Sequence, residues 1–242
     1  MKFGCIIRSV GERTENLCVE AVRRYLPEEN VDIVRNVRPF HMAVRRMFDI
    51  ANGKDYDWYL GLDADVVLID AWLNHVQDAV NNLKGDCHKI IFLVKDRFIA
   101  VPTFYGIHLY NHKYTNEAIR ILKRTQQDTK PEGNLRHHMS CPQFLYKKGI
   151  LGYHGYLQYC KDIFARFALR YSRDKSYVIK HQVFKDMDEE KRIAKMGWEY
   201  AQSNKMDFTD FAIRDKFSGK FTELPELDMS LDEFYKQFGD KE

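Results

Sequence analysis

The most constraining feature of the sequence is an apolar run interrupted by two aspartates that are separated by a single residue. Residues 56–62 are mostly aromatic and aliphatic, which predicts a buried β-strand. Asp63 and Asp65 end this strand, and four more apolar residues, 66–69, follow directly. Neighbouring anions repel each other unless a positive charge lies between them. We therefore expect a hard divalent cation, Mn²⁺ or Mg²⁺, at this point.

The alternative role of Asp63 and Asp65 is structural, because aspartate often ends a strand by bonding the backbone N–H groups of a turn. A turn-forming pair does not usually stand between two apolar runs, so the metal interpretation is favoured. Mg²⁺ and Mn²⁺ typically bind through one or two carboxylates together with substrate phosphates. The motif therefore predicts a metal-assisted reaction of a phosphorylated substrate.

Length and composition indicate an ordinary globular protein. A chain of 242 residues fits one large domain, or one domain with an appended tail. A net charge of +3 argues against general nucleic-acid binding. The number of cysteines, 5, is odd and none are spaced as in a zinc site, which predicts reduced, mostly buried thiols. The apolar stretch at residues 3–7 is too short for a signal peptide or membrane span, so we expect a cytoplasmic protein.

Strand and helix patterns alternate through the first hundred residues. Strands are predicted over residues 3–7, 31–34, 56–63 and 89–94, and helices over residues 15–25, 41–51 and 71–83. This order is typical of an α/β domain with a largely parallel sheet. The carboxyl ends of parallel strands meet at one edge, where ligands bind. We therefore expect the loop of residues 8–14 and the two aspartates to line one crevice.

The second half of the chain is less regular. The pattern predicts a strand over residues 103–110, a helix over 116–124, a polar loop over 125–136 and an amphipathic helix over 156–171. From about residue 186 the chain is interpreted as an appendage, with a helix over 188–201. Ser230 and Glu233 form a capping-box sequence that opens a last short helix, which Gly239 ends.

Between residues 38 and 69 the sequence resembles glycosyltransferases of the GT-A fold, of the family-2-like kind. A helix carrying Ala43, Arg45 and Arg46 leads through a short polar turn into the strand that delivers the Asp63-Ala-Asp65 motif. The resemblance implies a Rossmann-like α/β fold, with a mixed, mostly parallel sheet flanked by helices. It also implies a glycosyltransferase domain over residues 1–185, with a nucleotide-sugar half over 1–100 and an acceptor half over 101–185. Residues 186–242 would then form a helical C-terminal extension packed on that domain.

The activity that the resemblance implies is metal-dependent transfer of a sugar, of the hexosyltransferase type. The donor would be a nucleoside-diphosphate sugar, and the acceptor a hydroxyl of a glycan, a lipid-linked glycan or a protein glycan. Asp65 would bind the Mn²⁺ or Mg²⁺ directly, and Asp63 would hold the ribose or the water shell of the metal. The remaining donor-binding residues carried over by the resemblance are Arg8, Ser9 and Glu12 for the base, and Arg45 or Arg46 for the diphosphate or the base.

Two motifs of this family are missing. The first loop lacks the Pro-x-Tyr-Asn sequence that often follows the first strand, which leaves the individual base contacts open. No Gln-x-x-Arg-Trp motif is present, which argues against a processive polysaccharide synthase.

The catalytic base has several candidates because no Glu-Asp pair marks it. An inverting transfer needs a carboxylate that deprotonates the acceptor hydroxyl. Glu132, between Pro131 and Gly133, is the first choice, although a solvated loop glutamate is an equal alternative. Asp128 and Asp162 are the reserves.

Histidine is the expected further ligand of the metal, since a distal histidine completes the metal shell in several GT-A enzymes. His154, flanked by Gly152 and Gly155, is assigned to this role, with His137 and His138 as alternatives. Imidazole suits Mn²⁺ better than Mg²⁺. The competing interpretation is a histidine that is hydrogen-bonded in a turn.

The helix over residues 156–171 carries a basic face, for which three interpretations stay open. The face is an ordinary solvated surface, it steers an anionic donor, or it contacts an anionic membrane that carries a lipid-linked acceptor. Its residues are Lys161, Arg166, Arg170, Arg173 and Lys175.

Three other functions compete with sugar transfer. A haloacid-dehalogenase-like phosphatase would use Asp63 as nucleophile, but its motif normally ends the first strand and needs a later acidic pair. A nucleotidyltransferase usually carries a Gly-rich loop with Lys or Arg after the first strand, and Gly11 alone is a poor match. A catalytically inactive module that binds a nucleotide or sugar would have no need of two adjacent carboxylates.

Overall fold

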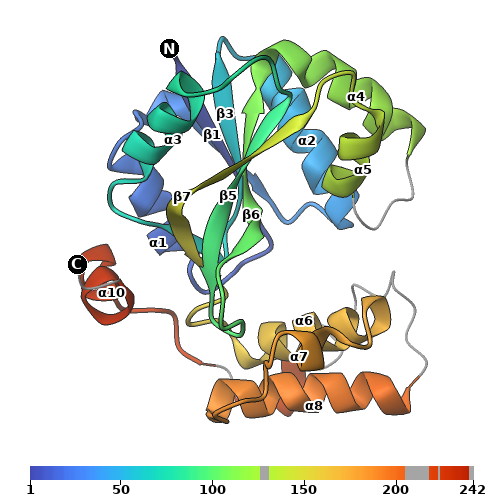
Figure 1. Ribbon diagram of the computed structural model, residues 1–242. Coiled ribbons are helices and arrows are strands. Elements are labelled where there is room, and N and C mark those ends of the chain that lie inside the picture. Colours follow the sequence, from blue (N-terminus) through green and yellow to red (C-terminus); the bar gives the residue numbers. More distant parts are fainter. Residues whose placement is uncertain (126–130, 205–217, 223, 240–242) are drawn as a thin grey trace.

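The computed structural model describes residues 1–125, 131–204, 218–222 and 224–239 (Figure 1). The strands are β1 (Phe3–Ser9), β2 (Val31–Arg35), β3 (Trp58–Asp63), β4 (Val66–Leu68), β5 (Lys89–Asp96), β6 (Thr103–Asn111) and β7 (Gln143–His154). The helices are α1 (Glu15–Arg23), α2 (Phe40–Asn52), α3 (Trp72–Asn81), α4 (Thr115–Arg124), α5 (Pro131–His138), α6 (Cys160–Arg173), α7 (Tyr177–Lys180), α8 (Glu189–Ser203) and α10 (Leu231–Phe238). Short 3₁₀ turns span Glu28–Asn30, His112–Tyr114 and Ser218–Lys220.

The strands form one seven-stranded sheet in the order β2-β1-β3-β6-β5-β7-β4. β1 pairs in parallel with β2 and β3, and β5 pairs in parallel with β7. β6 and β4 run in the opposite direction, against their neighbours. The expected α/β fold with a mixed, mostly parallel sheet flanked by helices is thus confirmed, and it is consistent with a Rossmann-like GT-A architecture.

Alternating residues of the strands belong to two separate hydrophobic cores, because successive side chains in a strand point to opposite faces of the sheet. Cys5 and Leu60 lie in the core beneath α1 and α3, whereas Ile6 and Tyr59 lie in the core beneath α2 and α4. Figure 1 shows α1 and α3 on one face of the sheet and α2, α4 and α5 on the other. Helices therefore cover both faces of the sheet, and the edge where the parallel strands have their carboxyl ends is left for a ligand site.

A third layer of helices lies below the carboxyl ends of β1 and β5 (Figure 1). It consists of α6, α7 and α8, which share their own core, including Phe167 and Trp198. Arg97, just after β5, joins this layer to the sheet through ion pairs of 2.6 Å with Asp188 and with Glu190. Sheet and helical layer thereby face each other across the carboxyl edge.

The chain end returns to the sheet through α10. The predicted capping box of Ser230 and Glu233 is present, and the helix ends before Gly239 as expected. Phe234 is fully buried in the core beneath α1, and the Tyr235 hydroxyl donates a hydrogen bond of 2.7 Å to the backbone oxygen of Leu68. The division of the chain at residue 186 stays a prediction.

Three segments differ from the sequence-based expectation. The predicted loop over residues 125–136 is wrong for residues 131–136, since α5 begins at Pro131. Proline suits the first helical position because its missing N–H would have no helical partner there, and the fully buried Leu135 anchors the helix. The strand β7 has no counterpart among the predicted elements, because two lysines and Gly149 interrupt its apolar pattern and most of its first half is exposed.

The helix expected from residue 156 begins only at Cys160 and extends to Arg173. β7 continues through His154, and Gly155 and Leu157 then have φ angles of 75° and 54°. These left-handed conformations cannot belong to a right-handed helix. The other predicted elements are present, with ends shifted by a residue or two.

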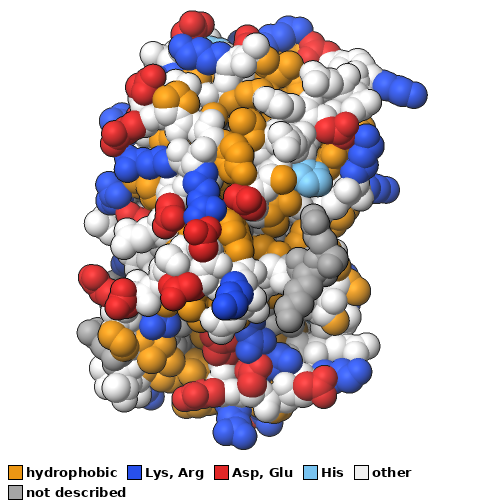
Figure 2. Space-filling model, turned by 90° about the vertical axis from the view of Figure 1, so that its left-hand side faces the viewer, with side chains coloured by type: hydrophobic (Ala, Val, Ile, Leu, Met, Phe, Trp, Pro, Cys, Tyr) orange, Lys and Arg blue, Asp and Glu red, His pale blue; other side chains and the backbone are white. Residues whose placement is uncertain are grey.

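On the face seen in Figure 2, acidic and basic side chains are interspersed over both layers, and neither charge forms a continuous patch. Cys5, Cys18 and Cys87 are buried, Cys141 and Cys160 are half-buried, and all are unpaired, as expected. None of the helices in the described ranges is long and apolar enough to cross a membrane.

Candidate functional site

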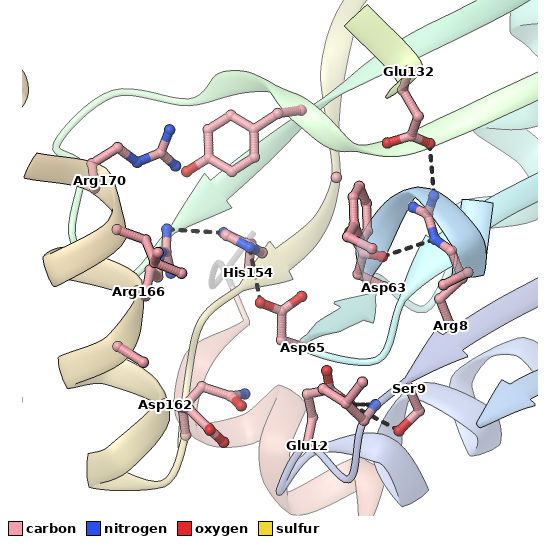
Figure 3. Close-up of a pocket in the computed structure, with 18 of the residues that line it drawn as sticks. Arg8, Ser9, Glu12, Asp63, Asp65, Glu132, His154, Asp162, Arg166 and Arg170 are labelled. Carbon is pink, nitrogen blue, oxygen red and sulfur yellow. Dashed lines mark hydrogen bonds and ion pairs between the residues drawn. The ribbon is translucent and has the colours of Figure 1, made fainter. Parts of the chain in front are cut away.

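A pocket of about 630 Å³ lies between the carboxyl edge of the sheet and α6. Arg8 and Asp63 line it from the adjacent parallel strands β1 and β3, in which they occupy paired positions. Glu132 lines it from α5, and Arg166 from α6. Figure 3 shows Arg8, Asp63 and Glu132 on one side and the arginines of α6 on the other. The pocket is therefore where ligands bind in open α/β sheets.

Arg8 links the two carboxylates on the sheet side of the pocket. Its side chain is 4% exposed, with Nε 2.9 Å from Oδ1 of Asp63 and Nη1 2.8 Å from Oε1 of Glu132. Burial raises the pKa of Asp63 and, with repulsion from Asp65, outweighs the attraction of Arg8. Arg8 is thus a buried cation shared by two acidic groups.

Glu132 is held as an anion by three donors. Its Oε1 accepts hydrogen bonds from Arg8 and from the Tyr110 hydroxyl, at 2.6 Å, and lies 3.1 Å from Nδ1 of His108. Burial by itself would raise the pKa of Glu132, but Arg8 and then His108 attract the charge and hold the pKa well below its usual range. All these contacts involve one oxygen, and Figure 3 shows the other turned away from Arg8.

The turn between β3 and β4 is fixed by its backbone. The N–H of Ala64 donates to the oxygen of Arg8 at 2.9 Å, and Thr14 Oγ1 donates to the oxygen of Ala64 at 2.9 Å. The oxygen of Asp65 accepts a bond of 3.0 Å from the N–H of Gly155. These bonds place Asp65 beside the end of β7, where Oδ2 lies 3.1 Å from Nε2 of His154. Its Oδ1 is buried and has no hydrogen-bond partner.

His154 is clamped between Asp65 and Asp96. Its Nδ1 lies 2.6 Å from Oδ2 of Asp96, whose side chain is fully buried. The same oxygen lies 2.5 Å from Nη2 of Arg166 and accepts a hydrogen bond from Tyr105. Burial opposes the imidazolium, but the two carboxylates prevail and raise the pKa of His154 to about 9. The histidine is therefore part of an ion-pair chain that runs from the turn to α6.

Asp96 and Tyr105 were missed by sequence analysis. A usable signal existed for Asp96, because it follows the apolar run of β5 as Asp63 follows that of β3. Tyr105 gives no such signal, since aromatic residues are frequent throughout the chain.

The loop after β1 lines one end of the pocket. Glu12 Oε2 accepts hydrogen bonds of 2.8 Å from the Ser9 hydroxyl and from the N–H of Val10. Burial, together with the charge of Asp65, raises the pKa of Glu12. Gln158, also missed by sequence analysis, lies here: its amide donates to Thr14 Oγ1 at 2.9 Å, and its Oε1 is buried without a partner.

Most sequence-predicted site residues line the pocket together. They are Arg8, Ser9, Glu12, Asp63, Asp65, Glu132, His154 and the reserve Asp162 (Figure 3). The exceptions are Arg45 and Arg46 on α2, which are not among the lining residues, and His137 and His138, which are exposed at the end of α5. Asp128 lies outside the described residues.

The basic face of α6 is not an ordinary solvated surface. Arg166, Arg170 and Arg173 line the pocket because this side of the helix is turned toward the sheet. The first of the three interpretations is therefore wrong for these arginines.

A complete protein-built metal centre is not seen. Within residues 1–125, 131–204, 218–222 and 224–239, no three His, Cys, Asp or Glu side chains are placed to hold a metal ion. Asp63 faces Arg8, and His154 lies between Asp65 and Asp96. The buried, unpartnered Oδ1 of Asp65 nevertheless fits a hard cation, since Mg²⁺ needs only one or two carboxylates when substrate phosphates supply further ligands. The residues fit a metal that arrives with its substrate.

No family model and no curated protein matches the chain. A glycosyltransferase involved in glycosylation of the major capsid of PBCV-1 matches it in structure with a TM-score of 0.45 and 11% identity, over 64% of this chain and 93% of that one. The cytidylyltransferase for 2-C-methyl-D-erythritol 4-phosphate from Thermus thermophilus gives 0.44 and 12%, over 62% and 90%. The bifunctional IspDF from Campylobacter jejuni gives 0.44 and 7%, over 62% of this chain and 50% of that one, so the match spans about half of IspDF. At these TM-scores the likenesses carry no functional assignment.

Proposed function

We propose that this protein is a metal-dependent glycosyltransferase that takes its sugar from a nucleoside-diphosphate donor. The observation that carries the proposal is the buried, unpartnered Oδ1 of Asp65 on the wall of a pocket that also holds Asp63 and Arg8. A buried carboxylate oxygen without a donor is costly unless a cation or ligand meets it. Mn²⁺ or Mg²⁺ carrying a diphosphate would meet it.

In this proposal the donor lies along the sheet edge. Ser9 and Glu12 receive the nucleoside, and Asp65 with Asp63 holds the metal beside the diphosphate. The bound metal supplies electrostatic stabilisation of the negative charge that develops on the leaving diphosphate. His154 is a positioning residue, because it fixes the Asp65 carboxylate through its contact with Asp96.

Glu132 is the proposed catalytic base. In an inverting transfer the acceptor oxygen attacks the anomeric carbon and its proton passes to the Glu132 carboxylate. The bond from that carbon to the diphosphate oxygen breaks, and the nucleoside diphosphate leaves with the electron pair. Arg8 keeps Glu132 ionised, and its free oxygen faces the pocket (Figure 3). The reserve Asp162 lies on α6 on the opposite wall, at the end of the pocket where Glu12 lies, and is therefore the less favoured base.

The experiment is a donor-hydrolysis screen, in which water replaces the unknown acceptor. Purified protein is incubated with uridine, guanosine, cytidine and thymidine diphosphate sugars, with and without Mn²⁺, and free sugar and nucleotide are measured. We expect hydrolysis of at least one donor that requires the metal. Pyrophosphate release from a nucleoside triphosphate and a sugar phosphate would instead identify a nucleotidyltransferase. Nucleotide binding without any turnover would identify a binding module.

A further inference from the structure

Two arginines on the pocket side of α6 lack a carboxylate partner among the described residues. Arg170 has its guanidinium carbon 4.4 Å above the centre of the Tyr177 ring, and Arg173 has a buried Nε without a hydrogen-bond partner. Arg166, one turn earlier, differs because Asp96 neutralises it. Arg170 and Arg173 both line the pocket, so an anion held there would lie close to two positive charges.

The surroundings of this pair favour an anion. Residues three apart on a helix are neighbours, so the two guanidinium groups repel each other. Burial, followed by the charge of Arg170, lowers the pKa of Arg173. The hydroxyl of Tyr177, a residue that is 6% exposed, is also buried without a partner. An oxyanion in the pocket would offer acceptors to the two guanidinium groups that line it, since the guanidinium fork matches phosphate and carboxylate geometry.

The position of the pair along α6 distinguishes it from the donor end. In the view of Figure 3, Asp162 lies on α6 at the level of Glu12, whereas Arg170 lies farther along α6, in the direction of the end of the pocket where Glu132 lies. At 1.5 Å per residue, Arg173 lies about 16 Å farther along the helix axis than Asp162. Asp65 and His154 stand between these two ends (Figure 3). A nucleoside bound at Ser9 and Glu12, with its diphosphate at Asp65, therefore leaves the arginine end for the acceptor.

We infer that Arg170 and Arg173 bind an oxyanion, a phosphate or a carboxylate, of the acceptor. The sugar acceptor is thus a phosphorylated or acidic molecule, held with its hydroxyl toward Glu132. This inference rests on the proposed function, because it takes the opposite end of the pocket as the donor site.

The test is calorimetric titration of the full chain with inorganic phosphate and, separately, with acetate, after saturation with a nucleoside diphosphate and Mn²⁺. The variants are Arg170→Gln, Arg173→Met, which keeps an aliphatic stem, and the two combined. Arg170→Lys keeps the charge but removes the fork. The matched control is Lys175→Gln, which removes one positive charge from an exposed position just after the helix. Thermal melts of all variants check folding.

We expect the double variant to bind phosphate or acetate at least tenfold more weakly, with nucleotide binding unchanged within twofold and Lys175→Gln like the wild type. Tighter binding of phosphate or of acetate identifies which oxyanion the acceptor carries. The inference would be overturned if the double variant bound phosphate and acetate as tightly as the wild type, or if the wild type bound neither anion. A parallel loss of nucleotide binding would place the arginines in the donor site and also overturn it. Absence of nucleotide binding in the wild type would instead refute the proposed function.

Discussion

Arg8 and Asp63 occupy paired positions on adjacent parallel strands, and Nε of Arg8 lies 2.9 Å from Oδ1 of Asp63. Parallel register thus places a cation beside the first aspartate of the motif. The same guanidinium also contacts Glu132 on α5, with Nη1 2.8 Å from Oε1. One buried arginine therefore pairs with two carboxylates in the pocket, and it is the main charge that keeps Glu132 ionised.

Replacement of Arg8 by methionine should destabilise the protein by about 3–5 kcal/mol, because Asp63 and Glu132 lose the cation that compensates them. Chemical denaturation at pH 7 measures this loss. Arg23→Met is the matched control, since Arg23 forms an exposed ion pair of 2.9 Å with Glu28 and should change stability by less than about 1 kcal/mol. Equal losses in the two variants would contradict a shared buried cation.

Replacement of Glu132 by glutamine should lower the rate of sugar transfer by about 10²- to 10⁴-fold, because the amide cannot accept the acceptor proton. Nucleotide affinity should stay within twofold of wild type, since the proposed donor contacts lie elsewhere. Steady-state kinetics with a separate binding titration measure both quantities. Glu199→Gln, at an exposed position on α8, is the control. A variant with unchanged turnover would exclude Glu132 as the base.

Replacement of Phe234 by alanine should destabilise the sheet by about 3–5 kcal/mol, although the residue belongs to the last helix of the chain. Phe234 is fully buried against the core beneath α1, so its removal leaves a cavity there. Leu224→Ala, at an exposed position in the same segment, should have little effect. Urea denaturation of both variants compares them. Equal free energies of unfolding for Phe234→Ala and Leu224→Ala would show that α10 does not contribute to the core.

Acidification should destabilise the protein partly through His88, which lies at the start of β5 and away from the pocket. Burial lowers the pKa of His88. In acid, His88 is therefore protonated in the unfolded chain but not in the folded protein. Stability falls as the pH drops below the ordinary histidine pKa of about 6.5. In His88→Asn the amide can keep the contact that Nδ1 makes with the oxygen of Cys141, at 2.5 Å.

The measurement for His88 is the free energy of unfolding at pH 7.5 and at pH 5.0. We expect a smaller difference between the two values in His88→Asn than in the wild type. The control His137→Asn, at an exposed position, should retain the wild-type difference. A His88→Asn variant as acid-sensitive as the wild type would refute this assignment.

Much of the sheet could be predicted from the sequence because its strands carry continuous apolar runs. The edge position of Asp63 and of the loop at Ser9 and Glu12 follows from strand direction alone. β7 was not predicted, because two lysines and Gly149 separate its short apolar run at residues 144–146 from its buried second half. Without β7, nothing in the sequence places His154 opposite Asp65.

Glu132 shows a different limit of sequence reasoning. Its assignment to the pocket was made from a predicted loop, yet a helix delivers it. Gly133 weakens the local helix signal, and contacts distant in sequence, such as the burial of Leu135 and the ion pair to Arg8, stabilise the helix instead. The inward turn of Arg170 and Arg173 also depends on packing, because an amphipathic pattern does not tell which neighbour covers a polar face.

The most direct measurement is calorimetric binding of uridine, guanosine, cytidine and thymidine diphosphates to the wild type and to Asp65→Asn, each with and without Mn²⁺. The account predicts that at least one diphosphate binds the wild type only with metal, and that Asp65→Asn loses this binding while its thermal melt stays cooperative. Asp70→Asn, at an exposed position just after β4, should bind like the wild type. Equal metal-dependent binding by Asp65→Asn, or no metal-dependent binding by the wild type, would contradict the account.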